Sequence, residues 1–394
     1  FYLNENSSGG AKIDYNFLIP YIIGFSENFK ESLNLFLNEK ATLIHSPVFY
    51  IFNGYLLKIT NSLLLIKFLN IFLSCLIPYI IYECLKLKYK IDNKTIFFLS
   101  LVIFLSPYFR TSAIWLLGDN LSLLFFSLSI FYYFKTINRN NKIDYFLCLL
   151  FLILCCYIRY YYCLFVIFYL FHFMKNTNKN LFLQLIIFCF LFSLPAIIYL
   201  LYIIENFNYF ELLSNKVSIN YFNNLLFILT ILFFYLIPFL IFFIKDIYFY
   251  YKDKKLIIFS IILFLLSSYF INGFYGQFNL NNSYGGGVFD KLLKVLNINI
   301  LAGIYLISFL SIVSFNFLFK SSRFQNYFVI IILILCFPLG TIYQKYFDPL
   351  FLILFFTLID TSLLKKIILA DDNKIYFIKS YFLIFLTFSI IYYL

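Results

Sequence analysis

The stretch Leu181–Ile203, LFLQLIIFCFLFSLPAIIYLLYI, decides the fold class because it carries no charged residue and is long enough to cross a membrane. A helix needs about 20 apolar residues to span the ~30 Å hydrocarbon core of a bilayer. Across all 394 residues, 63% are hydrophobic and 12% are charged, and the mean hydropathy is +0.91. Globular domains carry about 25% charged residues. These values exclude a soluble protein and predict an all-α, polytopic transmembrane protein.

Outward from this stretch, the sequence contains about twelve apolar segments of this kind, several of them short enough to be re-entrant helices that line a cavity. They are Ser62–Cys84, Thr95–Leu105, Ser112–Phe134, Tyr145–Tyr157, Tyr160–Met174, Leu181–Ile203, Tyr221–Ile244, Leu256–Ile271, Asn299–Phe319, Tyr327–Phe337, Pro349–Leu364 and Ile375–Leu394. We expect residues 1–394 to form a single membrane domain with its spans in residues 62–394. Because the chain begins with Phe1 and not Met, we also expect a further helix upstream, for about thirteen in all.

The basic residues alternate along the chain in a way that predicts orientation. The connections around residues 86–94, 135–142, 175–179, 245–255, 320–323 and 365–374 are rich in Lys and Arg. The intervening connections, 1–61, 106–111, 205–220, 272–297 and 339–348, are poorer in them. Positive charge marks the cytoplasmic side. We therefore expect a multi-pass protein of a bacterial inner or plasma membrane, with residues 1–61 as the first external loop and the active site on the external face.

The net charge of +12 arises from 30 Lys and Arg against 18 Asp and Glu. Because these lysines are dispersed among the loops, they argue for membrane orientation and against a nucleic-acid partner. The eight cysteines lie in apolar stretches and imply no disulfide framework. The two histidines, His45 and His172, are far apart in the sequence, so we expect no structural metal site.

Two external features of the first loop could carry chemistry. Asp14 follows the pair Gly9-Gly10, where the backbone can approach a ligand closely, although a lone loop Asp is most often simply solvated. His45-Ser46-Pro47 is typical of a helix start, whose free N–H groups attract anions; a helix cap is the alternative interpretation.

Three further charged residues interrupt the apolar pattern. Asp119 is expected about two turns into a span, beside the only Trp of the chain. A carboxylate inside a membrane span indicates a functional site. The alternative is a buried structural ion pair with Arg110 or Arg159. Arg159 could be an interfacial anchor or an internal cation facing a phosphate. Lys345 is external, against the charge bias, and either attracts an anion or snorkels to the interface.

The order of these features resembles the integral-membrane GT-C glycosyltransferases, especially the dolichyl-phosphate-mannose mannosyltransferase-like and aminoarabinose lipid A transferase-like branch. The resemblance runs along most of the chain on short motifs. His45-Ser46-Pro47 looks like the family's His-Pro-Pro or Lys-Pro-Pro element, and Lys345-Tyr346 looks like its late Arg-Tyr pair. Ser and Lys replace the family's residues at these two places.

The resemblance implies transfer of a hexose or pentose from a polyprenyl-phosphate donor to a lipid, glycan or protein hydroxyl, with inversion. Asp14 would be the catalytic base, supported by Asp119, and His45, Lys345 and Arg159 would bind the donor phosphate. Next to these residues, Tyr15 and Tyr346 are expected to contact the acceptor. Some relatives use a divalent metal, which we do not favour here.

Two other functions fit a protein of this class. A lipid-linked oligosaccharide flippase or other transporter would show internal repeats and charges near the membrane midplane. We find no obvious repeat, and the polar residues gather at the external ends. An O-antigen polymerase-like or ligase-like enzyme would depend on external arginines, of which this chain has few. The Asp14 loop favours the glycosyltransferase.

Overall fold

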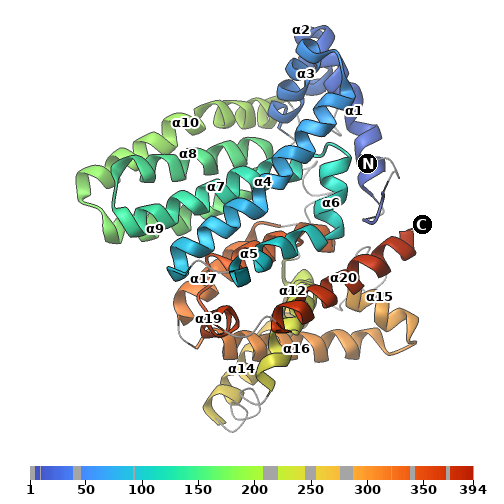
Figure 1. Cartoon of the computed structure of the whole chain (residues 1–394), viewed down its shortest axis with the longest axis vertical. Coiled ribbons are helices and arrows are strands. Elements are labelled where there is room, and N and C mark those ends of the chain that lie inside the picture. Colours follow the sequence, from blue (N-terminus) through green and yellow to red (C-terminus); the bar gives the residue numbers. More distant parts are fainter. Residues whose placement is uncertain are drawn as a thin grey trace. The chain divides into compact units, whose positions relative to one another are not determined.

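The computed structural model describes residues 5–8, 10–38, 46–91, 94–206, 221–244, 254–275, 287–320, 322–337, 342–369 and 373–393. Every regular element in these ranges is a helix, which confirms the predicted all-α class (Figure 1). Within the described ranges, five helices are long and apolar enough to span a membrane: Leu63–Tyr89, Gly118–Arg139, Lys179–Glu205, Ile300–Leu318 and Lys374–Tyr393. The pair Lys94–Leu105 and Pro107–Ile114, bent by 68°, would be a sixth if it is one span. These helices are compatible with an integral membrane protein, and the larger number of spans remains a prediction.

The chain divides into two compact units, with Phe1–Leu212 and Phe382–Leu394 in the first and Leu213–Tyr381 in the second. The first unit contains α1 (Ala11–Glu27), α2 (Phe29–Asn38), α3 (Val48–Thr60), α4 (Leu63–Tyr89), α5 (Lys94–Ser100), η1 (Leu101–Leu105), α6 (Pro107–Ile114), α7 (Gly118–Arg139), α8 (Lys142–Ile158), η2 (Tyr160–Leu164), α9 (Phe165–Asn176) and α10 (Lys179–Asn206). The second contains α12 (Tyr221–Leu240), η3 (Ile241–Phe243), α14 (Lys254–Tyr275), α15 (Gly287–Val295), α16 (Ile300–Leu318), α17 (Arg323–Leu335), η5 (Gln344–Tyr346), α18 (Leu350–Phe356) and α19 (Ser362–Ile368). Helix α20 (Asn373–Tyr393) includes the boundary between the units.

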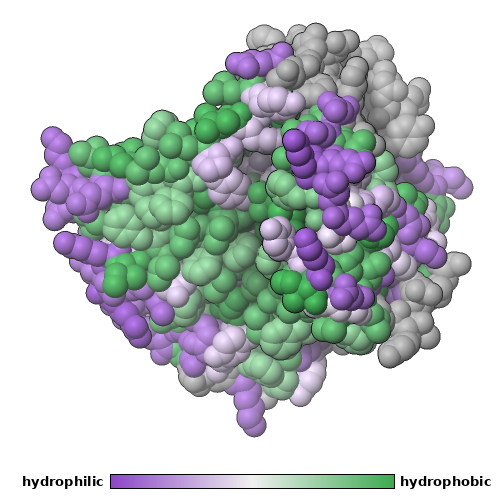
Figure 2. Space-filling view, turned by 90° about the horizontal axis from the view of Figure 1, so that it is seen from above, coloured by the Kyte–Doolittle hydropathy of each residue, from purple (hydrophilic) through white to green (hydrophobic). Residues whose placement is uncertain are grey.

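Helix α7 is the centre of the first unit, with α4 on one side and α8 on the other (Figure 1). Ser122, Ser127 and Ser129 on α7 are fully buried, and small residues let membrane helices approach closely. Outside α8 lies α10, whose Phe190 and Ile198 are 59% and 65% exposed, as suits side chains in contact with lipid. Figure 2 shows hydrophobic side chains covering a broad area of the face in view, with hydrophilic residues along its border.

The structure corrects one predicted span. Ser112–Phe134 is not one helix, because α6 ends at Ile114, Leu116 adopts a left-handed φ of 50° and α7 begins at Gly118. The Nδ2 of Asn70 donates to the carbonyls of Ser112 and Ala113, at 3.3 and 2.8 Å, and so satisfies acceptors that the helix end leaves open. Asp119 therefore lies in the first turn of α7 and not two turns into a span.

The predicted first loop is largely helical, and its helices α1 and α3 pack at backbone distance around Gly54. A Cβ on Gly54 would lie 2.6 Å from the Cβ of Phe25 and 3.0 Å from the carbonyl oxygen of Ile22. No side chain fits in that space without moving one helix.

Gly54→Ala is therefore expected to lower the free energy of unfolding by about 1–3 kcal/mol, the usual cost of overpacking. Thermal unfolding of the purified protein in detergent, followed by circular dichroism, measures the effect. Gly10→Ala is the matched control, because a Cβ there meets no atom within 4 Å. Equal melting temperatures for the two variants would contradict the close contact of α1 and α3.

In the second unit, α12 packs against α16 and α15. Its core includes Leu226, Phe227, Leu293 and Ile304. The buried Gln344 accepts a hydrogen bond from the Val288 N–H at 2.9 Å and donates one to the Tyr235 hydroxyl at 2.8 Å. These bonds fix η5, which carries Lys345 and Tyr346, to α15 and α12.

Candidate functional site

Helix α1 presents Asp14 on its first turn. The N–H of Asp14 donates to the Gly10 carbonyl at 3.0 Å, so the carboxylate stands at the helix N-terminus, where the dipole favours negative charge. The Asp14 side chain lies in a half-buried position, and Tyr15 beside it packs against Trp115. A carboxylate that keeps contact with solvent in this way can accept a proton from a bound hydroxyl.

Asp119 and Arg159 form an ion pair between the start of α7 and the residue that follows α8. The Arg159 Nε lies 2.8 Å from the Asp119 Oδ1, and the Tyr161 hydroxyl donates to the same oxygen at 3.5 Å. The side chains of Arg159 and Asp119 are 14% and 40% exposed. Of the two partners that the sequence left open for Asp119, Arg159 is the one with which it forms an ion pair.

Close packing of three helix ends brings this pair together. A Cβ on Gly118 would lie 3.2 Å from the Cγ2 of Ile158 and 3.4 Å from the ring of Phe49. Gly118 directly precedes Asp119, and Ile158 directly precedes Arg159. The ends of α7 and α8 therefore meet at the start of α3, which is where Phe49 and Tyr50 lie.

Tyr50 connects this ion pair with Asp14. Its side chain is buried between rings of α1 and α2, with the Tyr21 and Phe36 centroids at 6.0 and 5.4 Å. Burial raises the pKa of Tyr50 to about 12; the charge of Arg159 lowers this pKa, and the charges of Asp119 and Asp14 raise it. The phenol therefore stays protonated at neutral pH.

The charge of Arg159 is maintained by Asp119. Burial by itself would lower the pKa of Arg159, but the charge of Asp119 and its hydrogen bond to the guanidinium raise it. A guanidinium held in this way is a fixed positive charge with five N–H donors, a geometry suited to phosphate or carboxylate.

His45, Lys345 and Tyr346 are the other residues predicted for the site. His45 lies outside the described residues, although α3 does begin just after Ser46-Pro47, with the Val48 N–H donating to the Ser46 Oγ at 3.3 Å. Lys345 and Tyr346 belong to the second unit. There the Lys345 ammonium lies 5.8 and 5.9 Å from the ring centres of Tyr343 and Tyr346, and Tyr346 stacks on Phe337.

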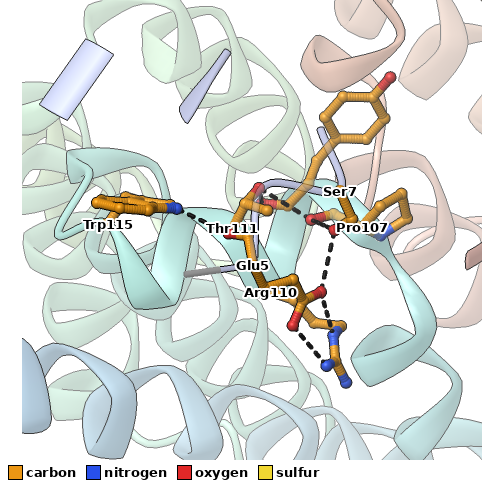
Figure 3. A network of polar contacts seen from close by, with 7 residues as sticks. Glu5, Ser7, Pro107, Arg110, Thr111 and Trp115 are labelled. Atoms are coloured by element: carbon orange, nitrogen blue, oxygen red, sulfur yellow. Dashed lines mark hydrogen bonds and ion pairs between the residues drawn. The ribbon is translucent and has the colours of Figure 1, made fainter. Parts of the chain in front are cut away.

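An unpredicted contact holds the residues before α1 on α6 (Figure 3). Arg110 donates from Nε and Nη2 to the two carboxylate oxygens of Glu5, at 2.9 and 2.7 Å. The indole Nε1 of Trp115 donates to the Glu5 carbonyl at 2.8 Å, and the Thr111 hydroxyl donates to Ser8 at 2.8 Å. Arg110 therefore forms its ion pair with Glu5 of the N-terminal segment and not with Asp119. Glu5 stands in a short polar stretch with no motif that would have indicated this contact.

The contact between Glu5 and Arg110 is expected to weaken in acid. Burial would raise the pKa of Glu5, but hydrogen bonds from Arg110 and Ser7 and the charge of Arg110 lower it below the usual 4.5. Because the folded pKa is the lower one, the stabilisation is complete above pH 4.5 and is lost as pH falls through the folded pKa. Emission of Trp115, the only Trp, should shift in acid for the wild type, whereas Glu5→Gln should show the shifted emission already at pH 7. Glu27→Gln, at an exposed position, should behave as wild type; a pH profile unchanged by Glu5→Gln would contradict the prediction.

Within the described ranges, no group of three or more His, Cys, Asp or Glu side chains could hold a metal ion. Asp14 and the Asp119–Arg159 pair are the charged groups that this part of the first unit offers to a ligand. No family model, no curated protein and no solved structure matches this chain significantly.

Proposed function

We propose that the protein is a membrane glycosyltransferase. It moves a hexose or pentose from a polyprenyl-phosphate-linked donor to a lipid, glycan or protein hydroxyl on the external face, with inversion at the anomeric carbon. Residues 1–394 would work in a GT-C-like arrangement of about twelve spans. The observation that carries the proposal is the Asp119–Arg159 ion pair, held where the ends of α7 and α8 meet the start of α3.

Each residue has a distinct role in this reaction. Asp14 accepts the proton of the acceptor hydroxyl as its oxygen attacks the anomeric carbon. The bond between that carbon and the phosphate oxygen breaks, and the phosphate monoester leaves with the electron pair. The leaving group is already anionic and needs no general acid. Arg159 stabilises its charge, and Asp119 is a positioning residue because its carboxylate orients the guanidinium.

Tyr50 joins the two halves of the site as a neutral donor. A phenol that stays protonated can hydrogen-bond either to the acceptor oxygen or to a carboxylate without adding charge. His45, Lys345 and Tyr346 remain further proposed contacts to donor or acceptor.

The test is transfer from radiolabelled polyprenyl-phosphate sugars by membranes containing the full chain, with nucleotide sugars as the comparison donor. We expect label to reach an acceptor only from the lipid-linked donors. Movement of lipid-linked sugar across reconstituted vesicles without any transfer would overturn the proposal in favour of a flippase. Polymerisation of a lipid-linked oligosaccharide without use of monosaccharide donors would favour the polymerase-like enzyme.

A further inference from the structure

Two connections between helices lie side by side at one end of the first unit. One joins α7 to α8 and the other joins α9 to α10 (Figure 1). The buried ring of Tyr145, near the start of α8, has its centroid 4.7 Å from that of Phe173, near the end of α9. The Tyr145 hydroxyl also donates to the Asn140 Oδ1, between α7 and α8, at 2.8 Å. Tyr145 therefore holds the two connections together.

These connections and the helix ends beside them are basic. Residues 135–144 and 175–179 contain five basic side chains, which we call the basic end: Lys135, Arg139, Lys142, Lys175 and Lys179. All of them except Lys135 are exposed. The one acidic residue in these two ranges, Asp144, is buried in the first turn of α8. The exposed surface of the basic end is therefore positively charged.

The neighbouring end of α4 does not neutralise this charge. It adjoins the basic end, because the Asn138 Nδ2 donates to the Leu87 carbonyl at 3.2 Å. Glu83 is the one acidic residue in the last two turns of α4, and it pairs with Lys86 at 3.4 Å. Among the described residues, the region therefore keeps a net positive charge.

Exposed apolar side chains stand directly among these charges. Ile137, Ile143 and Met174 are each more than half exposed. Figure 2 shows hydrophilic residues at its left edge, directly beside a broad hydrophobic area. Apolar side chains lose free energy when they face water. A partner that combines an anionic group with hydrocarbon chains fits both parts of this surface.

Aromatic rings hold two of the ammonium groups where the apolar surface ends. The Lys135 Nζ lies 4.6 and 5.0 Å from the ring centres of Phe131 and Tyr132, and the Lys175 Nζ lies 4.1 Å from that of Phe171. Tyrosines and lysines that extend toward lipid headgroups are typical of the membrane interface. The rings thus favour a lipid headgroup over a soluble anion as the partner.

We propose that the basic end binds the headgroups of anionic phospholipids in the adjoining leaflet of the membrane. The ammonium groups attract the lipid phosphate, and the Arg139 guanidinium can donate two parallel hydrogen bonds to it. The acyl chains pack on the exposed apolar side chains. This interaction is independent of the sugar chemistry proposed for Asp14 and Arg159.

Binding of fluorescent phosphatidylglycerol to the full chain, purified in neutral detergent, tests the proposal. Fluorescence anisotropy measures the affinity, with fluorescent phosphatidylcholine as the uncharged comparison, and we expect the wild type to prefer phosphatidylglycerol. Two double variants each remove one pair of charges: Arg139→Gln with Lys142→Gln, and Lys175→Gln with Lys179→Gln. One basic residue near anionic lipid changes binding about fivefold, so each double variant should weaken phosphatidylglycerol binding about 25-fold. Phosphatidylcholine binding should stay as it was.

The charge-matched control is Lys30→Gln with Lys58→Gln, which removes two exposed lysines from α2 and α3. It should bind phosphatidylglycerol as the wild type does. Equal weakening in the control would overturn the basic end in favour of general attraction to any exposed lysine. Unchanged binding in both double variants would overturn it outright.

Two measurements on the wild type need no variant. Added salt should weaken phosphatidylglycerol binding and leave phosphatidylcholine binding unchanged, because charge attraction is screened. A wild type that binds the two lipids equally well at low salt would overturn the proposal. Inorganic phosphate that displaces phosphatidylglycerol at equal concentration would replace the lipid by a soluble anion.

Discussion

Asp14→Asn is expected to lower sugar transfer about 100- to 10,000-fold, the range for loss of a general base. The amide keeps the size of the side chain and its place on the first turn of α1, but it cannot accept the acceptor's proton at neutral pH. Initial rates at saturating donor and acceptor measure the effect. One negative charge at a helix N-terminus stabilises the fold by only about 0.3–1 kcal/mol. The melting temperature should therefore change little.

The control for this change is Glu27→Gln at the exposed end of the same helix. It removes one negative charge from α1 without touching the candidate site, so transfer should remain at the wild-type rate. Transfer that survives Asp14→Asn would keep the enzyme class but remove Asp14 as base. Asp119 would then be the next carboxylate to test, although its pairing with Arg159 suits it to positioning.

Arg159→Met is expected to have the largest effect on stability. Removing one partner of a buried ion pair costs about 3–5 kcal/mol because the other charge is left uncompensated. Asp119 is 40% exposed, so we expect the lower end of this range, about 3 kcal/mol. Thermal unfolding in detergent gives the stability, and transfer from the lipid-linked donor is expected to fall as well.

The double variant Asp119→Asn with Arg159→Met distinguishes positioning from phosphate binding. Removing both charges relieves the uncompensated carboxylate, so the double variant should be more stable than Arg159→Met alone. If Arg159 binds the donor phosphate, transfer should stay low in spite of this recovery. Transfer that returns together with stability would show that the pair is only structural.

The helical architecture was predictable because the length of an apolar segment can be read directly from the sequence. Segments such as Ser62–Cys84 and Leu181–Ile203 correspond to α4 and α10 within a few residues. The break inside Ser112–Phe134 was not predictable from hydropathy, since Leu116 and Leu117 are as apolar as their neighbours. It depends on tertiary hydrogen bonds from Asn70 to the end of α6.

The candidate site was predictable in its residue types but not in its pairing. Arg110 and Arg159 were equal partners for Asp119 in the sequence, and only the packing of Gly118 against Ile158 selects Arg159. Tyr50 ends the segment His45–Tyr50, yet a Tyr among 36 gives no signal of its own. Its importance comes from the three charges around it, which a linear sequence cannot show.

The contact at Gly54 has a consequence for motion. Since α1 and α3 touch through backbone atoms there, a change in their spacing would require both helices to separate along their contact. Asp14 and Tyr50 therefore travel as one rigid body.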